Sequence, residues 1–166
     1  MSESGRPLHI EPYSARHHAA VIDLILPIQT EEFGLSITAQ QQPDLSDIEK
    51  FYQQGNGQFW LAFADGRVVG CIALKDIGNR QAALRKMFVA AAYRGKAYGI
   101  GLALLNTLMA YAHKQGLTDI FLGTTALFLA AHRFYEKHGF TEISVPELPA
   151  SFPVMKVDTR FYRYRF

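Results

Sequence analysis

A short stretch in the middle of the chain combines the residue types that hold a phosphate group. The sequence passes from the apolar run Met87-Phe88-Val89 through a glycine-containing loop to the start of a helical pattern. Free N–H groups at a helix N-terminus stabilise an anion, and glycines let it approach the backbone. Arg94 and Lys96 add positive charges. We predict a phosphate site here, although the glycines alone suit a simple turn equally well.

Two common nucleotide-binding loops fail at positions that they require. A P-loop needs Ser or Thr directly after Gly-Lys, but Ala97 follows Gly95 and Lys96. A dinucleotide-binding loop needs a third glycine where Leu104 stands, and a parallel strand in front. The loop therefore belongs to neither class.

Two segments carry more specific patterns. The first is Lys96-Ala97-Tyr98-Gly99-Ile100-Gly101, followed by Leu104-Leu105. The second, residues 130–140, contains Ala, two residues, Phe-Tyr, three residues and Gly-Phe. Together they strongly resemble the GNAT superfamily of N-acetyltransferases, in which a strand precedes Gln or Arg, two residues, Gly, one residue, and Gly or Ala. The resemblance covers roughly residues 59–143, and the two N-terminal helices of the superfamily match residues 14–52.

The loop fits this first motif in two registers. Lys96–Gly101 places Lys where Gln or Arg is usual, whereas Arg94–Gly99 restores the Arg but places Ala97 at the first glycine. We prefer the first register, because both glycines and the Leu pair agree with it. The choice decides which amide meets which phosphate oxygen.

The resemblance implies an acetyl-CoA-dependent N-acetyltransferase that acetylates a primary amine by direct attack in a ternary complex. It makes Tyr135 the general acid for the departing thiolate, and a phenol of pKa about 10 is still protonated at neutral pH. Without the motif, Tyr135 reads as a core aromatic that shares a helix face with Phe128 and Ala131. The main alternative is a non-catalytic acyl-CoA-binding module that senses or scaffolds.

The resemblance also assigns the residues that hold acetyl-CoA. The main chain before the loop pairs with the pantetheine arm, the loop binds the pyrophosphate, and two side chains of a later helix line the cofactor. Exposed Lys137 is explained equally well as a solvated charge. The full set is Met87, Phe88, Val89, Arg94, Gly95, Lys96, Ala97, Tyr98, Gly99, Ile100, Gly101, Phe134 and Lys137.

The acceptor side rests on fewer residues. Glu31 and Glu32 end the first predicted helix, in the region that forms the acceptor wall of superfamily members. Their charges favour a cationic small-molecule or peptide amine, although a solvated helix end explains them equally well. Asp76 is a second candidate for the base that takes the proton of the amine. The identity of the acceptor stays undetermined, because the same fold serves many different acceptors in the superfamily.

Composition and spacing argue against several other classes. Seventeen basic and fifteen acidic side chains give a charge of +2, which provides no footprint for nucleic acid or an anionic membrane. His17 and His18 point different ways on a helix, and His132 and His138 do not share a face, so we predict no metal site. The lone Cys71 lies in an apolar run. We expect a cytoplasmic chain with a buried thiol, and leave a homodimer open.

Hydrophobic periodicity and turn signals predict the elements that position these residues. Asp65-Gly66 suits a tight hairpin turn, and the alternation of helix and strand after Gly99 predicts at least one parallel strand pair. In the basic and aromatic tail, strand alternation would turn Tyr162, Tyr164 and Phe166 inward. We expect one domain, residues 1–166, of the α/β (α+β) class, with a GNAT-like mixed, mostly antiparallel twisted sheet flanked by about four helices. Strands are expected near 8–13, 59–64, 67–74, 84–89, 120–122 and 161–166, and helices near 14–27, 43–52, 99–116 and 125–139.

Overall fold

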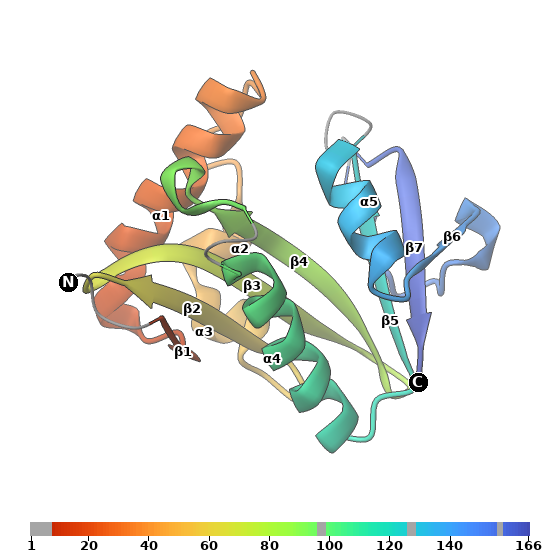
Figure 1. Ribbon diagram of the computed structural model, residues 1–166. Helices are drawn as coiled ribbons and strands as arrows, with labels where there is room; N and C mark the ends of the chain where they lie inside the picture. The colour runs from red at the N-terminus through yellow and green to blue at the C-terminus, as the bar shows by residue number, and fades with distance from the viewer. Residues whose placement is uncertain (1–7, 96–98, 126–128, 156–157) are drawn as a thin grey trace.

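One seven-stranded sheet organises the chain, with the strand order β1-β2-β3-β4-β5-β7-β6. The computed structural model describes residues 8–95, 99–125, 129–155 and 158–166. Within these ranges five α-helices accompany the sheet (Figure 1). The strands are β1 (His9–Pro12), β2 (Gln58–Ala64), β3 (Arg67–Gly78), β4 (Gln81–Val89), β5 (Asp119–Thr124), β6 (Thr141–Ile143) and β7 (Arg160–Arg165). The α-helices are α1 (His18–Pro27), α2 (Pro43–Ser46), α3 (Ile48–Tyr52), α4 (Ile100–Lys114) and α5 (Leu129–Lys137).

The strand directions confirm the predicted mixed, mostly antiparallel sheet. β1 to β4 form an antiparallel meander, while β4 and β5 are parallel. Asp65 and Gly66 have φ angles of 54° and 76°, as the predicted tight turn between β2 and β3 requires. β7 pairs antiparallel with both β5 and β6.

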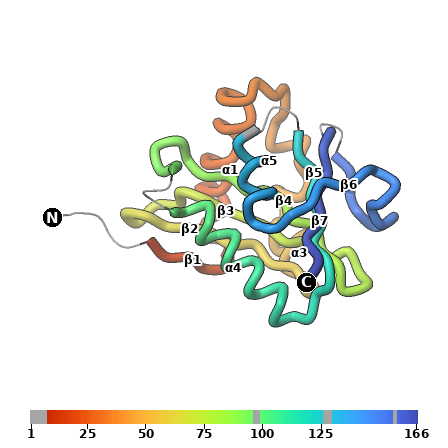
Figure 2. The backbone as a smooth tube through the Cα atoms, turned by 45° about the vertical axis from the view of Figure 1, so that its right-hand side comes forward, coloured from red at the N-terminus to blue at the C-terminus, as the bar shows by residue number. Residues whose placement is uncertain are grey.

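The two faces of the sheet pack against different helices (Figures 1 and 2). Trp60 of β2 belongs to a core that includes Leu104 of α4 and Tyr135 of α5. Phe59 and Leu61, on either side of it, belong to a second core with α1, α2 and α3. This alternation is the period of two that a strand imposes on its side chains.

The second predicted helix is wrong as a single element. It is divided into α2 and α3 at Asp47, whose φ of −147° is not helical and whose carboxylate accepts a hydrogen bond from the N–H of Lys50. The first helix agrees better, because α1 ends at Pro27 and continues only as the π-helical turn η2 (Ile28–Glu32).

The C-terminal strand follows its predicted alternation only in part. Tyr162 is fully buried as expected, but Phe161 is 4% exposed on the opposite face. There it contacts Phe152, which lies between β6 and β7 in the sequence. Phe166 is 41% exposed instead of buried. β6, which was not predicted, pairs with the outer edge of β7 and makes it an interior strand of the sheet.

Candidate active site

β4 and β5 separate in the middle of the sheet, and this opening forms the centre of the site (Figure 1). Their parallel ladder joins only Gln81–Ala83 to Asp119–Phe121. β4 continues to Val89 and β5 to Thr124, without further ladder partners for each other among the described residues. The edge of β4 beyond Ala83 therefore offers backbone N–H and C=O groups to a ligand.

A β-bulge accompanies this separation. Cys71 pairs with Phe88 and Ala73 with Arg85, so two residues of β4 lie opposite one residue of β3. One of the two is Lys86, whose φ of 53° lies in the left-handed region that non-glycine residues rarely adopt. A bulge bends its strand and increases the local twist. The bulge lies three residues beyond Ala83, the last ladder partner of β5, in the part of β4 that is separate from β5.

A pocket of about 240 Å³ occupies the opening. Met87 and Phe88, two of the residues predicted to hold the cofactor, contribute to its lining from β4. Thr124 and Thr125 contribute from the end of β5, and Tyr135 from α5. The hydroxyl of Thr124 is buried without a hydrogen-bond partner among the described residues. Such an orphaned group is typical of a place where a ligand supplies the partner.

Tyr135 lies inside the molecule and faces this pocket. Its side chain is 6% exposed and packs against the rings of Phe134, Phe140 and Tyr162. Burial raises the pKa of its phenol above the usual value. The hydroxyl donates to Met87 Sδ over 3.5 Å, a long contact to a weak acceptor. Tyr135 therefore keeps its proton and can give it to a stronger acceptor.

The glycine loop leads into the N-terminus of α4. Gly95 and Gly99 have φ angles of 107° and 63°, so both adopt backbone conformations that favour glycine. The N–H of Gly99 donates to Gly95 O, and Gly99 is the N-cap of α4. A Cβ on Gly101 would meet Met87 Cε at 3.5 Å, which is ordinary contact, and the side chain of Ile100 is buried in the core. Lys96, Ala97 and Tyr98 lie outside the described residues.

Comparison with known proteins decides the family. A model described as the acetyltransferase (GNAT) family matches residues 22–140, which include the opening, the loop and α5. The chain belongs to this GNAT family. An acetyltransferase of the GNAT family from Staphylococcus aureus Mu50 is 40% identical, covers 95% of this chain and 98% of its own, and has a TM-score of 0.91. The fold of this GNAT chain is therefore that of its family.

Two further relatives of the GNAT chain differ in how much of each protein the match covers. N-acetylaspartate synthetase of Xenopus tropicalis is 42% identical over 108 residues, which are 63% of this chain and 38% of that protein. Among relatives of this kind, the matched part is between 37% and 57% of the length of the curated protein. The PaiA N-acetyltransferase of Thermoplasma acidophilum, solved in complex with coenzyme A, has a TM-score of 0.76 at 18% identity, covers 97% of this chain and 100% of its own, and shares the fold.

Two predicted residues of the GNAT site pair with each other. Arg94 Nη1 lies 2.6 Å from Glu32 Oε1, and Nη2 donates to Glu32 Oε2 at 3.0 Å. Its Nε donates to the carbonyl of Val89 at 2.8 Å. Arg94 therefore ties the loop after β4 to the turn that ends α1. Glu31 and Glu32 are exposed and are absent from the pocket lining, to which the same turn contributes Gln29 instead.

The remaining predicted residues lie at the edge of the site or away from it. Phe134 is half-buried, and its ring is 4.0 Å from the position that a Cβ on Gly101 would take. Lys137 is exposed in the last turn of α5. Asp76, considered as a base, accepts hydrogen bonds from the N–H groups of Asn56 and Gly78. It pairs in register with Ala82, at the closed end of β4, so its role is to stabilise turns.

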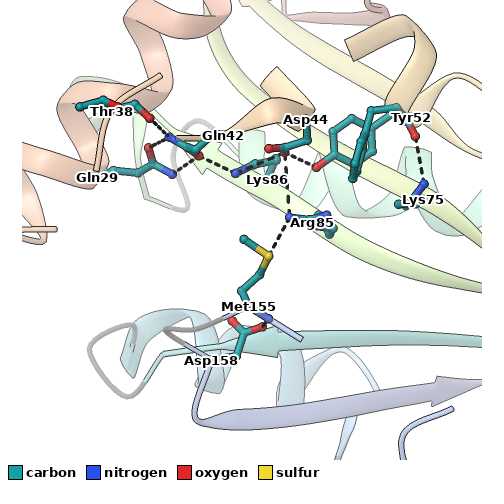
Figure 3. A network of polar contacts seen from close by, with 11 residues as sticks. Gln29, Thr38, Gln42, Asp44, Tyr52, Lys75, Arg85, Lys86, Met155 and Asp158 are labelled. Carbon is teal, nitrogen blue, oxygen red and sulfur yellow. Dashed lines mark hydrogen bonds and ion pairs between the residues drawn. The ribbon is translucent and has the colours of Figure 1, made fainter. Parts of the chain in front are cut away.

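Sequence reasoning missed a network of polar side chains beside the pocket (Figure 3). Lys86 Nζ donates to Gln42 Oε1 at 2.7 Å and lies 3.4 Å from Asp44 Oδ2. Gln42 and Gln29 exchange two amide hydrogen bonds, and the Tyr52 hydroxyl donates to Asp44 Oδ2 at 2.6 Å. Desolvation by burial lowers the pKa of Lys86 despite this carboxylate.

A sequence signal for this network did exist. Arg85 and Lys86 interrupt a strand that is otherwise apolar. Charged residues are almost never fully buried unless they are paired or functional. Two cations within a buried strand next to the motif could therefore have been singled out. Their partner Asp44 could not, because the sequence pattern favoured it as the start of a helix.

Several groups considered from the sequence have structural explanations. Cys71 is fully buried in β3, and burial raises the pKa of its thiol to about 12, which confirms the predicted buried thiol. Among the described residues, no three His, Cys, Asp or Glu side chains gather as a metal would need. Within the same ranges, every helix is too short or too polar to cross a bilayer.

Proposed function

We propose that the chain is an acetyl-CoA-dependent N-acetyltransferase that acetylates a primary amine by direct attack in a ternary complex. The observation that carries this proposal is the single pocket between β4 and β5. It joins the open backbone edge of β4 to the buried hydroxyl of Tyr135. The names of the curated relatives, which are synthetases of an N-acetylated amino acid and N-acetyltransferases, agree with it.

The residues around the opening fit coenzyme A. The main chain of Met87, Phe88 and Val89 would pair with the pantetheine arm, and the loop before α4 would bind the pyrophosphate. Gly95, Lys96, Ala97, Tyr98, Gly99, Ile100 and Gly101 would form this loop, with Phe134 and Lys137 at its side. Because Glu32 already engages Arg94, we assign the motif to the register Lys96–Gly101. When bound, acetyl-CoA supplies the thioester whose C–S bond breaks as the C–N bond to the acceptor forms.

Tyr135 would hold the proton that the departing sulfur needs. Its raised pKa keeps the phenol protonated until a strong acceptor comes within reach of Oη. The acceptor attacks as a neutral amine, after its ammonium form has lost one proton to solvent, and its nitrogen gives up a second proton as the amide forms. That proton restores the phenol, so the chain ends the cycle as it began. Tyr135 thus acts as a general acid without net consumption of protons.

Amine-dependent release of free thiol from acetyl-CoA tests the proposal. The full chain is assayed with a panel of amino acids, diamines, polyamines and lysine peptides, and coenzyme A affinity is measured in parallel. We expect release that saturates with at least one amine. Coenzyme A binding without release in the presence of any amine would contradict the proposal and favour a sensor or scaffold module.

A further inference from the structure

Arg85 is a buried cation in the pocket that lacks a strong partner among the described residues. Its side chain is 11% exposed, and its Nη2 lies 4.0 Å from Asp44 Oδ2. The same nitrogen donates to Met155 Sδ at 3.2 Å, and the guanidinium lies beside the rings of Phe51 and Tyr52. A guanidinium has five N–H donors, and a thioether is a weak acceptor. Most of its hydrogen-bonding capacity is therefore available to a ligand.

The nearby carboxylates are already engaged elsewhere. Asp44 accepts from Tyr52 and pairs with Lys86 at 3.4 Å, closer than it lies to Arg85. Asp158 Oδ2 accepts from the N–H of Met155 at 2.9 Å, and burial raises the pKa of its carboxyl. This carboxyl packs against β5, where a Cβ on Gly123 would come within 2.6 Å of it. The charges of Arg85 and Lys86 partly offset this rise in the pKa of Asp158, but neither carboxylate forms a close ion pair with Arg85.

The position of Arg85 relates it to the reacting atoms. It lies two residues before Met87 on β4, and Met87 Sδ is 3.5 Å from the Tyr135 hydroxyl. Two residues of a regular strand span about 7 Å, which is an upper bound here because the bulge at Lys86 lies between them. A small molecule with a carboxylate and an amine a few bonds apart spans this distance. Arg85, Lys86 and Tyr135 all belong to the lining of the same pocket.

We propose that Arg85, with Lys86 beside it, binds a carboxylate of the acceptor, so that the substrate is a small amino acid and not a diamine or polyamine. The inference rests on the proposed transferase function and names its substrate class. A carboxylate accepts two parallel N–H bonds from a guanidinium, which a sulfur cannot do. A dication would instead meet the guanidinium of Arg85, which has no close ion-pair partner because Asp44 pairs with Lys86. This conclusion is the opposite of the one that Glu31 and Glu32 favoured.

Binding to the complex with coenzyme A tests the inference without turnover. L-Aspartate and succinate, which keeps the carboxylates but has no amine, are titrated by calorimetry into the full chain with excess coenzyme A. Aspartic acid diamide and putrescine are the matched probes without a carboxylate. We expect the carboxylates to bind at least about tenfold more tightly. Equal or tighter binding of the diamide or of putrescine overturns the inference.

Variants locate the contact. Arg85→Gln is expected to weaken succinate binding about thirtyfold or more, since it removes one partner of a buried charge pair. Arg67→Gln, which removes an exposed guanidinium on another hairpin, should match the wild type. Unchanged succinate affinity in folded Arg85→Gln overturns the inference. If that variant does not fold, Arg85→Lys is used instead. It keeps the positive charge but loses the paired N–H donors of the guanidinium, and must weaken succinate binding about tenfold.

Turnover separates this inference from the proposed function. Acetyl transfer to putrescine but not to aspartate would overturn the carboxylate site and leave the transferase intact. Succinate binding that depends on Arg85, without thiol release for any amine, would support the carboxylate site and overturn the transferase.

Discussion

The two ends of the β4–β5 pair use the same two strands for opposite purposes. At one end, Gln81–Ala83 pairs with Asp119–Phe121, and Ala82 and Ala83 are fully buried. At the other end the strands separate, and the pocket there is lined by Arg85 and Lys86, the carboxyl group of Asp158 and the ring of Tyr135. The first end is core, and the second end is the candidate site.

The bulge at Lys86 marks the boundary between these ends. It lies three residues after the last ladder pair, at a non-glycine residue with positive φ. Strained backbone of this kind persists only where the surrounding structure fixes it, and it gathers at functional sites. Cys71 Sγ and the side chains of Gln42 and Asp44 supply such contacts to Lys86. A small local irregularity thus turns a core strand into one wall of a binding site.

Replacing Tyr135 at the open end is expected to have the largest effect on turnover. Tyr135→Phe removes the proposed general acid while leaving the ring in place, so turnover should fall about a hundredfold or more. Affinity for coenzyme A should change little. Steady-state thiol release and equilibrium binding measure the two quantities.

A second buried tyrosine provides the control for this variant. Tyr162 donates its hydroxyl to Glu136 and is absent from the pocket lining. Tyr162→Phe should therefore retain turnover close to the wild type. Equal rates in the two variants would show that the role is assigned to the wrong tyrosine.

Removing a buried charge at the open end should lower the free energy of unfolding more than removing a surface charge. Lys86→Met leaves Asp44 buried beside a weaker partner and should lower the free energy of unfolding by about 3 kcal/mol. Lys50→Met removes an exposed lysine of a surface pair and should change it by less than about 1 kcal/mol. Urea unfolding compares the two. Similar losses would mean that the Lys86 network adds nothing beyond a surface ion pair.

The loop at the N-terminus of α4 should respond to charge more than to shape. Gly99→Asp places a carboxylate next to the predicted phosphate site and should weaken coenzyme A binding about tenfold. Gly99→Asn has the same size and tolerates the left-handed conformation, so it isolates the effect of charge. Calorimetric titration of both variants measures the difference. Identical affinities would contradict the phosphate assignment.

The smallest effect is expected for chemical labelling of Cys71, which lies on β3 beside the bulge. Burial raises the pKa of Cys71 to about 12, so its thiolate is scarce at pH 8 and becomes common only as the pH approaches that value. A thiol reagent should therefore label the native chain at pH 8 only as slowly as it unfolds. Rapid labelling without unfolding would indicate that the opening extends through β4 to β3.

The parts of the fold that the sequence predicted are those with local causes. The hairpin at Asp65 and Gly66, the amphipathic helix α4 and the end of α1 at Pro27 each depend on neighbouring residues alone. Tyr135 was singled out through a motif whose members lie in α5 and in the turn that follows it. These features can be predicted because residues close together in the sequence determine them.

The parts that were missed depend on contacts between distant segments. Arg94 and Glu32 are 62 residues apart, and Lys86 and Gln42 are 44 apart. Nothing near Asp44 shows that it will be buried against β4, and a lysine with positive φ has no sequence signature. The proposed cofactor side therefore rests on the loop motif. The proposed acceptor side rests on contacts that only the folded structure shows.

Residue-resolved amide hydrogen exchange along β4 tests the central claim most directly. If the open end of β4 holds coenzyme A, the amides of residues 85–89 that do not donate to β3 should exchange quickly in the free chain. They should become protected when coenzyme A is added, while the amides of Gln81–Ala83 should stay unchanged. Exchange that is unaffected by saturating coenzyme A in both regions would contradict this account.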